Sequence, residues 1–153
     1  GIFRVYTTKA GDPTTLDRSS SYAIFKDRET RIWVTSMSGV NLYNREEDNF
    51  TRIRDLGSWI MDIDQDADGN IWFSSQGNGL FKYDPDKQEW TNYVHSSAPG
   101  ALINDQVNCV LIDGNGEMWI GTMNGLCKYN AKEDQFELIP LDIPSSNICA
   151  IIN

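Results

Sequence analysis

Long hydrophobic runs are missing from this chain, and cysteine, proline and histidine are scarce. Its 153 residues include three cysteines, five prolines and one histidine. No apolar run approaches the roughly 20 residues that a helix needs to cross a bilayer. The cysteines, at positions 109, 127 and 149, have no CxxC spacing, which argues against a zinc site or a disulfide framework. Each lies in an apolar, strand-like context, so we expect free thiols there.

Positive charge is also limited. The chain has 13 lysines and arginines against 22 aspartates and glutamates, which gives a net charge of −9. Nucleic acids and anionic membranes are bound by basic surfaces, so this balance argues against nucleic acid as the main partner and against direct membrane contact. Hydrophobic residues make up 40% of the chain and aromatic residues 11%, which is typical of a globular protein.

An aromatic pattern occurs three times along the chain. In each copy a tryptophan is followed by a glycine, by a tyrosine ten or eleven residues after the tryptophan, and by a further aromatic seven residues after that. The anchors are Trp33, Gly39, Tyr43 and Phe50, then Trp72, Gly79, Tyr83 and Trp90, then Trp119, Gly125, Tyr129 and Phe136. Because the tryptophans recur in register, we interpret them as packing residues rather than as sugar-stacking platforms.

Each copy predicts four short strands. An apolar segment such as residues 107–112 comes first, and a turn rich in Asp, Gly and Asn leads from it into the strand that carries the tryptophan. A glycine turn then leads to the strand that ends in tyrosine, and the last aromatic lies in the fourth strand. No segment keeps a helical period over three turns. Four strands in about 40 to 45 residues are typical of a β-propeller blade, so we expect an all-β fold, a β-propeller fragment of about three and a half blades.

The expected boundaries follow from this period. Residues 1–16 are expected to hold the last strand of a preceding blade, and residues 147–153 the first strand of a following one. Between them lie the repeats 17–56, 57–102 and 103–146. Since the chain begins with Gly-Ile rather than Met, we expect it to be a segment of a longer protein whose remaining blades are its partners; a homodimer that completes a ring is the alternative.

The third unit matches a known repeat best, through Asp113, Gly116, Met118-Trp119-Ile120-Gly121-Thr122, Gly125-Leu126 and Tyr129. The second unit keeps Asp66, Gly69, Ile71-Trp72, Gly79-Leu80 and Tyr83, with Ser74-Ser75 in place of Gly-Thr. In the first unit, residues 28–31 replace the glycine turn and Thr35-Ser36 replaces Gly-Thr. These residues resemble the two-component regulator propeller repeat.

The resemblance implies a function. Such repeats build the periplasmic sensor region of bacterial hybrid two-component histidine kinases, many of which detect oligosaccharides. A parent of that kind would carry a transmembrane helix, a kinase and a response regulator. This chain shows no kinase-like glycine-rich motif, and its one histidine, His95, is expected in a loop, so we expect no enzyme activity and no cofactor in this segment.

Departures from the repeat suggest a ligand site. Asp62 and Asp64 stand where the other units have apolar residues, and the first strands of propellers line a central channel. Their carboxylates are therefore candidates for binding sugar hydroxyls, with solvation by channel water as the alternative. Trp59 is out of register with the other tryptophans and is a candidate exposed platform. The long linker 91–106 contributes three further polar candidates, Asn104, Asp105 and Gln106.

The segment 64–69, Asp-Gln-Asp-Ala-Asp-Gly, looks like the start of a calcium loop. That loop needs a glutamate at its twelfth position, where this chain has Ser75. The third unit has Asp113 and Gly116 at the positions of Asp66 and Gly69, so a hairpin turn explains both residues. We therefore expect no metal site here.

Three functions remain open from the sequence alone. The first is a ligand-sensing segment of a receptor that binds a carbohydrate. The second is a structural or protein-interaction propeller without a small ligand, because packing explains most of the distinctive residues. The third is a lyase or hydrolase built on a propeller, against which one histidine and no assignable nucleophile–base pair weigh.

Overall fold

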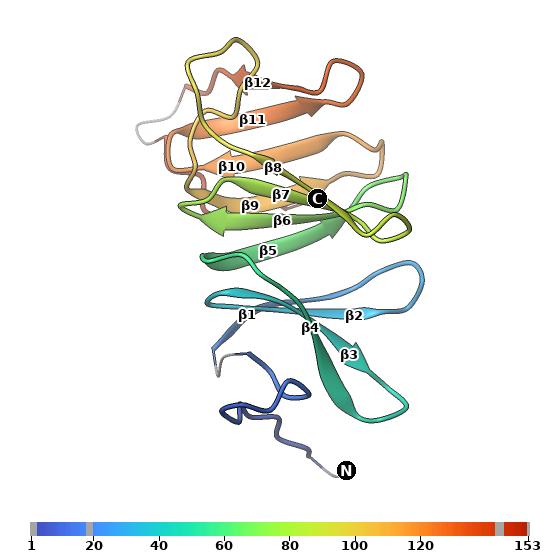
Figure 1. The fold of residues 1–153 in the computed structure, drawn as a ribbon. Coiled ribbons are helices and arrows are strands. Elements are labelled where there is room, and N and C mark those ends of the chain that lie inside the picture. The colour runs from blue at the N-terminus through green and yellow to red at the C-terminus, as the bar shows by residue number, and fades with distance from the viewer. Residues whose placement is uncertain (1–2, 18–19, 143–145, 153) are drawn as a thin grey trace. The chain divides into compact units, whose positions relative to one another are not determined.

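The computed structural model describes residues 3–17, 20–142 and 146–152, and within them it contains strands, turns and loops (Figure 1). The strands are β1 (Ser21–Lys26), β2 (Ile32–Ser36), β3 (Gly39–Asn44), β4 (Asn49–Asp55), β5 (Trp59–Gln65), β6 (Ile71–Gln76), β7 (Leu80–Asp84), β8 (Glu89–Tyr93), β9 (Val107–Ile112), β10 (Met118–Thr122), β11 (Gly125–Asn130) and β12 (Gln135–Ile139). No helix long and apolar enough to cross a membrane occurs among the described residues.

The twelve strands form three four-stranded sheets. Their orders are β1-β2-β3-β4, β5-β6-β7-β8 and β9-β10-β11-β12, so each sheet follows the chain from one strand to its neighbour. The described strand pairs are antiparallel. The predicted all-β fold with four strands per repeat is therefore confirmed. The chain divides into two compact units, residues 1–60 and 61–153, which are described separately below.

The turn between the first two strands of every sheet is closed by an aspartate six residues before the tryptophan. The indole N–H of Trp72 donates to Asp66 Oδ2 at 2.7 Å, while the backbone N–H of Asn70 donates to Asp66 Oδ1 at 2.9 Å. The same indole bonds join Trp33 to Asp27 at 2.8 Å and Trp119 to Asp113 at 3.2 Å. One carboxylate thus shapes the turn and also places the tryptophan.

The turn of the first sheet keeps this geometry without a glycine. Thr30 has a φ of 67°, where Gly69 and Gly116 have φ values of 90° and 80°. The backbone N–H of Asp27 donates to the Arg31 carbonyl at 3.0 Å, and the Arg31 side chain forms an ion pair with Asp27 at 2.5 Å. Left-handed backbone costs a non-glycine residue about 1–2 kcal/mol, and these bonds hold Thr30 in it.

The larger core lies in the second unit, between its two sheets. Trp72 and Leu80 pack with residues from β9 to β12 in one buried cluster. The Trp72 ring stacks on Tyr93 with centroids 5.6 Å apart and meets Tyr129 edge-on at 5.1 Å. Such aromatic pairs contribute about 0.5–1.5 kcal/mol each beyond the area they bury. The first unit has a smaller cluster of Leu16, Val34 and Phe50.

The segments expected to hold the end strands contain none among the described residues. Residues 3–17 form turns and irregular backbone, and Tyr6 packs edge-on against Phe50 with centroids 5.2 Å apart. Residues 146–152 are also irregular, but the Ile148 N–H donates to the Thr122 carbonyl at 2.9 Å. Both segments therefore lie against a sheet without joining it as a regular strand.

Two glycines that open a third strand leave no room for a side chain. Gly79 has a φ of +77°, and a Cβ built on it would lie 2.1 Å from the Tyr93 carbonyl oxygen. A Cβ on Gly39 would lie 2.2 Å from the Arg54 carbonyl oxygen. In both cases the obstacle is backbone of the fourth strand, which cannot move without breaking the sheet.

We predict that Gly79→Ala lowers the free energy of unfolding by about 2–4 kcal/mol, because it combines a backbone clash with a strained φ. Chemical denaturation measures the change. Gly114→Ala is the matched control, since a Cβ there meets nothing within 4 Å. Equal stability of the two variants would contradict the prediction.

Candidate functional site

The carboxylates of Asp62 and Asp64 bind the backbone of the next sheet. Asp62 Oδ2 accepts the Val110 N–H at 3.1 Å, and Asp64 Oδ2 accepts the Ile112 N–H at 2.6 Å. The other oxygen of each carboxylate accepts the N–H of the following residue in β5. The two predicted site residues therefore share one partner strand, β9. Their expected role toward a ligand remains a prediction.

Burial raises the pKa of Asp62, and the nearby Asp64 charge adds to the rise, while the backbone bonds from Val110 and Ile63 oppose it. Cys109 repeats the arrangement one sheet later. The Ile151 backbone hydrogen-bonds its thiol, and burial raises the pKa of Cys109 to about 11. In the second and third repeats, the residue at this position thus contacts the backbone that follows, with a carboxylate in one and a thiol in the other.

The three polar residues predicted from the linker hold loops together. The Asp105 carbonyl accepts the N–H groups of Gly77 and Gly79 at 3.0 and 2.9 Å, and its Oδ1 accepts the His95 N–H at 2.6 Å. The Gln106 N–H donates to Asn104 Oδ1 at 2.7 Å. The structure brings these three together at the turn between β6 and β7, and assigns Asp62 and Asp64 to a different contact, with β9.

Trp59 presents an open aromatic face. It begins β5, is 46% exposed, and stacks on Tyr22 of β1 with ring centroids 6.0 Å apart and an interplanar angle of 18°. Tyr22 is itself 38% exposed. The sequence predicts the platform at Trp59 but not its tyrosine neighbour, which belongs to another strand. A stacked and accessible pair of this kind suits the apolar face of a sugar ring.

The structure contains a cluster of two tyrosines and an aspartate that the sequence does not predict. Asp134, in the left-handed region at φ 52°, accepts the hydroxyls of Tyr129 at 2.5 Å and Tyr93 at 2.7 Å. Burial raises the pKa of Tyr93 to about 12 and also raises that of Tyr129, while these phenol bonds lower the pKa of Asp134. Tyr93 ends β8, so a tyrosine of the sheet β5–β8 donates a hydrogen bond to an aspartate of the following repeat.

The first unit contains the same cluster, in which Asp48 accepts the hydroxyls of Tyr43 and Tyr6, each at 2.5 Å. Arg4 also pairs with Asp48. The signal in the sequence is the match between the segments 2–6 and 89–93, both of which end in tyrosine, but the distant aspartate is not visible in it.

In the segment that looks like a calcium loop, the Asp66 carboxylate is already hydrogen-bonded within the turn. Besides the Trp72 indole, Asp66 accepts the Asn70 side-chain amide on both oxygens, at 3.1 and 2.9 Å. Among the described residues, no group of three or more His, Cys, Asp or Glu side chains is placed to hold a metal ion.

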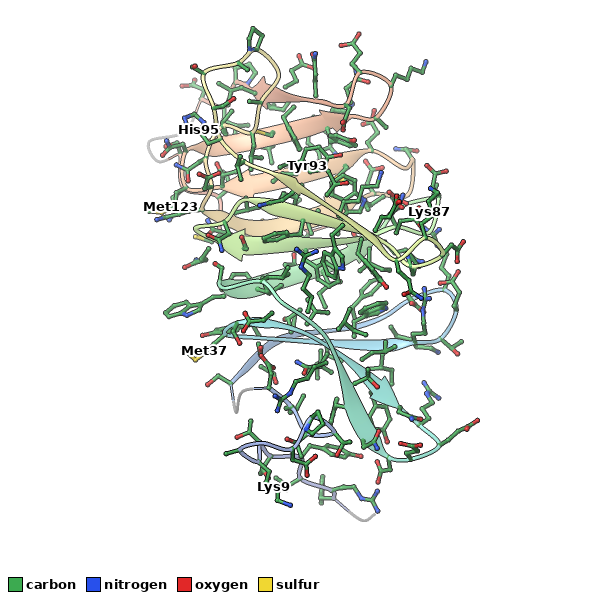
Figure 2. All side chains as sticks on the ribbon, in the orientation of Figure 1. Lys9, Met37, Lys87, Tyr93, His95 and Met123 are labelled. Atoms are coloured by element: carbon green, nitrogen blue, oxygen red, sulfur yellow. The ribbon has the colours of Figure 1, made fainter. Side chains whose placement is uncertain are left out.

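One histidine and two buried thiols are candidate groups for catalysis. His95, labelled in Figure 2, lies in the loop between β8 and β9, and its Nδ1 is 2.9 Å from the Leu102 carbonyl. The thiols of Cys109 and Cys127 are buried, and burial raises the pKa of both, which disfavours the reactive thiolate.

Comparison with known proteins finds a family model that is similar to part of the chain. Residues 101–124 match the family model described as two component regulator propeller. The resemblance to that repeat is confirmed. The match contains Trp119 and the Gly121-Thr122 pair, the features expected to carry it. A search of curated proteins gives no match.

Solved structures share the fold. The extracellular domain of a hybrid two component system from B. thetaiotaomicron superimposes with a TM-score of 0.73 at 22% identity, over 88% of this chain and 18% of that chain. A second such domain from the same organism gives 0.72 at 19% identity, over 88% and 19% of the two chains. Virginiamycin B lyase from Staphylococcus aureus gives 0.67 at 11% identity, over 86% and 45%. The chain therefore has the fold of a partial β-propeller and spans about a fifth of the receptor domains it resembles.

We predict a pH-dependent stability difference between the wild type and Asp62→Asn. Because the folded-state pKa of Asp62 is raised, the wild type loses stability relative to the variant as the pH rises from about 3 to about 7. Denaturation at both pH values measures this. Asp84→Asn is the control of opposite sign, since the Lys87 side chain lowers the Asp84 pKa and that stabilisation is lost as the pH falls. A stability difference between the wild type and Asp62→Asn that stays the same from about pH 3 to about pH 7 would contradict the raised pKa of Asp62.

Proposed function

We propose that this chain is a ligand-sensing propeller segment of an extracytoplasmic bacterial two-component receptor and that it binds an oligosaccharide. The observation that carries the proposal is the exposed stack of Trp59 and Tyr22. Large aromatic rings contribute most when they are covered, so an accessible pair offers a platform to a partner. The match to the two component regulator propeller model and the fold shared with receptor extracellular domains support the sensor role.

Binding accounts for these residues better than catalysis does. A propeller lyase is also a structural neighbour, so the fold alone does not decide between them. A hydrolase or lyase needs a positioned base and acid, and burial raises the pKa of the Cys109 and Cys127 thiols, which disfavours them as nucleophiles. The acids Asp62 and Asp64 lie on backbone N–H groups of β9. We therefore propose no reaction for this segment.

We predict that Trp59→Ala weakens binding of a saccharide about tenfold or more and lowers the melting temperature by only a few degrees, because the ring is 46% exposed and the change removes its stacking on Tyr22. Titration calorimetry against a panel of neutral oligosaccharides measures the affinity. Met123→Ala is the matched control, since Met123, labelled in Figure 2, is 43% exposed on the turn between β10 and β11. Binding of no saccharide by the wild type would favour a structural or protein-interaction propeller instead.

A further inference from the structure

A polar hollow of about 440 Å³ lies in the first unit, within the range of roughly 300–1,000 Å³ that is usual for small-molecule sites. Lysine, arginine, aspartate and hydroxyl groups line it, among them Thr8, Lys9, Asp17, Ser38, Arg52 and Asp55. Lys9 is labelled in Figure 2, on the loop that precedes β1. Two acidic and two basic residues therefore contribute to its lining.

Arg52 fixes the loop that forms one wall of this hollow. Its Nη2 donates to the carbonyls of Asp12 at 3.0 Å and Leu16 at 3.4 Å, and its Nε donates to the Thr15 carbonyl at 3.4 Å. Asp12 in turn accepts the N–H and hydroxyl of Thr14 at 3.0 and 2.7 Å. The wall is thus shaped by specific bonds, and they fix the Arg52 guanidinium.

Asp17, the residue after Leu16, is held by a buried polar network. Its Oδ2 accepts the hydroxyls of Ser36 and Ser38, both at 2.7 Å, and its Oδ1 accepts the Asn41 amide at 2.7 Å. Ser36 and Asn41 are fully buried. A carboxylate oriented by three neutral donors at the edge of a hollow is preorganised as a hydrogen-bond acceptor.

The third repeat shows that the fold does not need this network. Asn41 pairs with the residue after Trp33, and Cys127 pairs with the residue after Trp119, so the two positions are equivalent. The residue that bonds each of them is Asp17 in the first repeat and Ile103 in the third, through a backbone N–H in both cases. Each follows a buried leucine, Leu16 or Leu102.

The first repeat therefore has polar residues at two contacting positions where the third repeat has apolar ones. An apolar pair performs the packing role in the third repeat, and buried polar groups are costly unless every bond is made. Since positions that depart from the local rule of a fold are commonly functional, the paired change marks the hollow as a site.

We propose that this hollow binds one neutral sugar ring of the oligosaccharide, an inference that rests on the function proposed above. A sugar hydroxyl both donates and accepts, so Asp17 and Asp55 can accept while Lys9 and Arg52 donate. Lys9 also pairs with Asp12 at 3.6 Å, so carboxylates outnumber cations around the hollow, which disfavours an anionic ligand. The mixture of donors and acceptors suits a polyhydroxylated one. Trp59 follows Asp55 by four residues, and the Gly57 N–H between them donates to the Ser38 carbonyl at 3.1 Å.

Asp17→Ile combined with Asn41→Cys tests the site by copying the pair of the third repeat into the first. The 153-residue chain and this variant are titrated by calorimetry with glucose, galactose, mannose and their oligosaccharides. We expect the variant to remain folded, as judged by its melting temperature, and to bind the saccharide that the wild type binds at least about tenfold more weakly. Asp17→Asn, which keeps the size of the side chain, should weaken binding in the same direction.

NMR of the wild type locates the ligand, because the Asn41 side-chain amide lies next to Asp17 and should shift on saturation. Unchanged affinity in both variants, or shifts confined to Trp59, would overturn the hollow as the site while leaving the proposed function intact. A wild type that binds no saccharide at all would overturn both. Asp86→Asn, an exposed change in the second unit, is the matched control and should leave the affinity unaltered.

Discussion

The hydrogen bonds from the indoles of Trp33, Trp72 and Trp119 to the aspartate six residues earlier are the contacts on which the three sheets depend. A buried indole N–H needs an acceptor, and a hairpin turn needs a group that satisfies its backbone N–H. Asp66 supplies both through one carboxylate, and bonds to an ionised acceptor are stronger than neutral ones. The bond therefore joins the shape of the turn to the position of the largest core side chain. It tolerates Thr30 in place of glycine because the carboxylate and not the glycine defines the turn.

Around this constant frame, the same backbone positions carry different chemistry in different repeats. Asp62 and Cys109 both face the backbone that follows them, one as a carboxylate acceptor and the other as a buried thiol. Asn41 and Cys127 likewise share a place in the strand pairing. Because the frame does not depend on these side chains, they can differ from one repeat to the next.

The sequence predicts the four strands of each repeat, but it predicts the side-chain contacts between repeats only in part. Tryptophan, glycine and tyrosine spacing indicates four strands per repeat because hairpins and strand length are local properties. Asp62 stands out in the sequence as an acid among apolar equivalents, but its bond to Val110 depends on where the next sheet lies. The Tyr93–Asp134 bond joins residues 41 positions apart, across a linker whose length differs between repeats. Such pairs are visible only when the sheets are placed in space.

The tyrosine that completes a neighbouring cluster has a consequence for how such proteins evolve by duplication. Tyr93 ends β8, yet its hydroxyl bonds Asp134, which lies just before β12. The group of residues that must be present together therefore begins one strand earlier in the sequence than the sheet β9–β12. A gene segment cut at the sheet boundary would separate the phenol from its carboxylate. A segment that begins just before such a tyrosine would carry the complete cluster to a new location, and recombination that preserves folding should favour that staggered border.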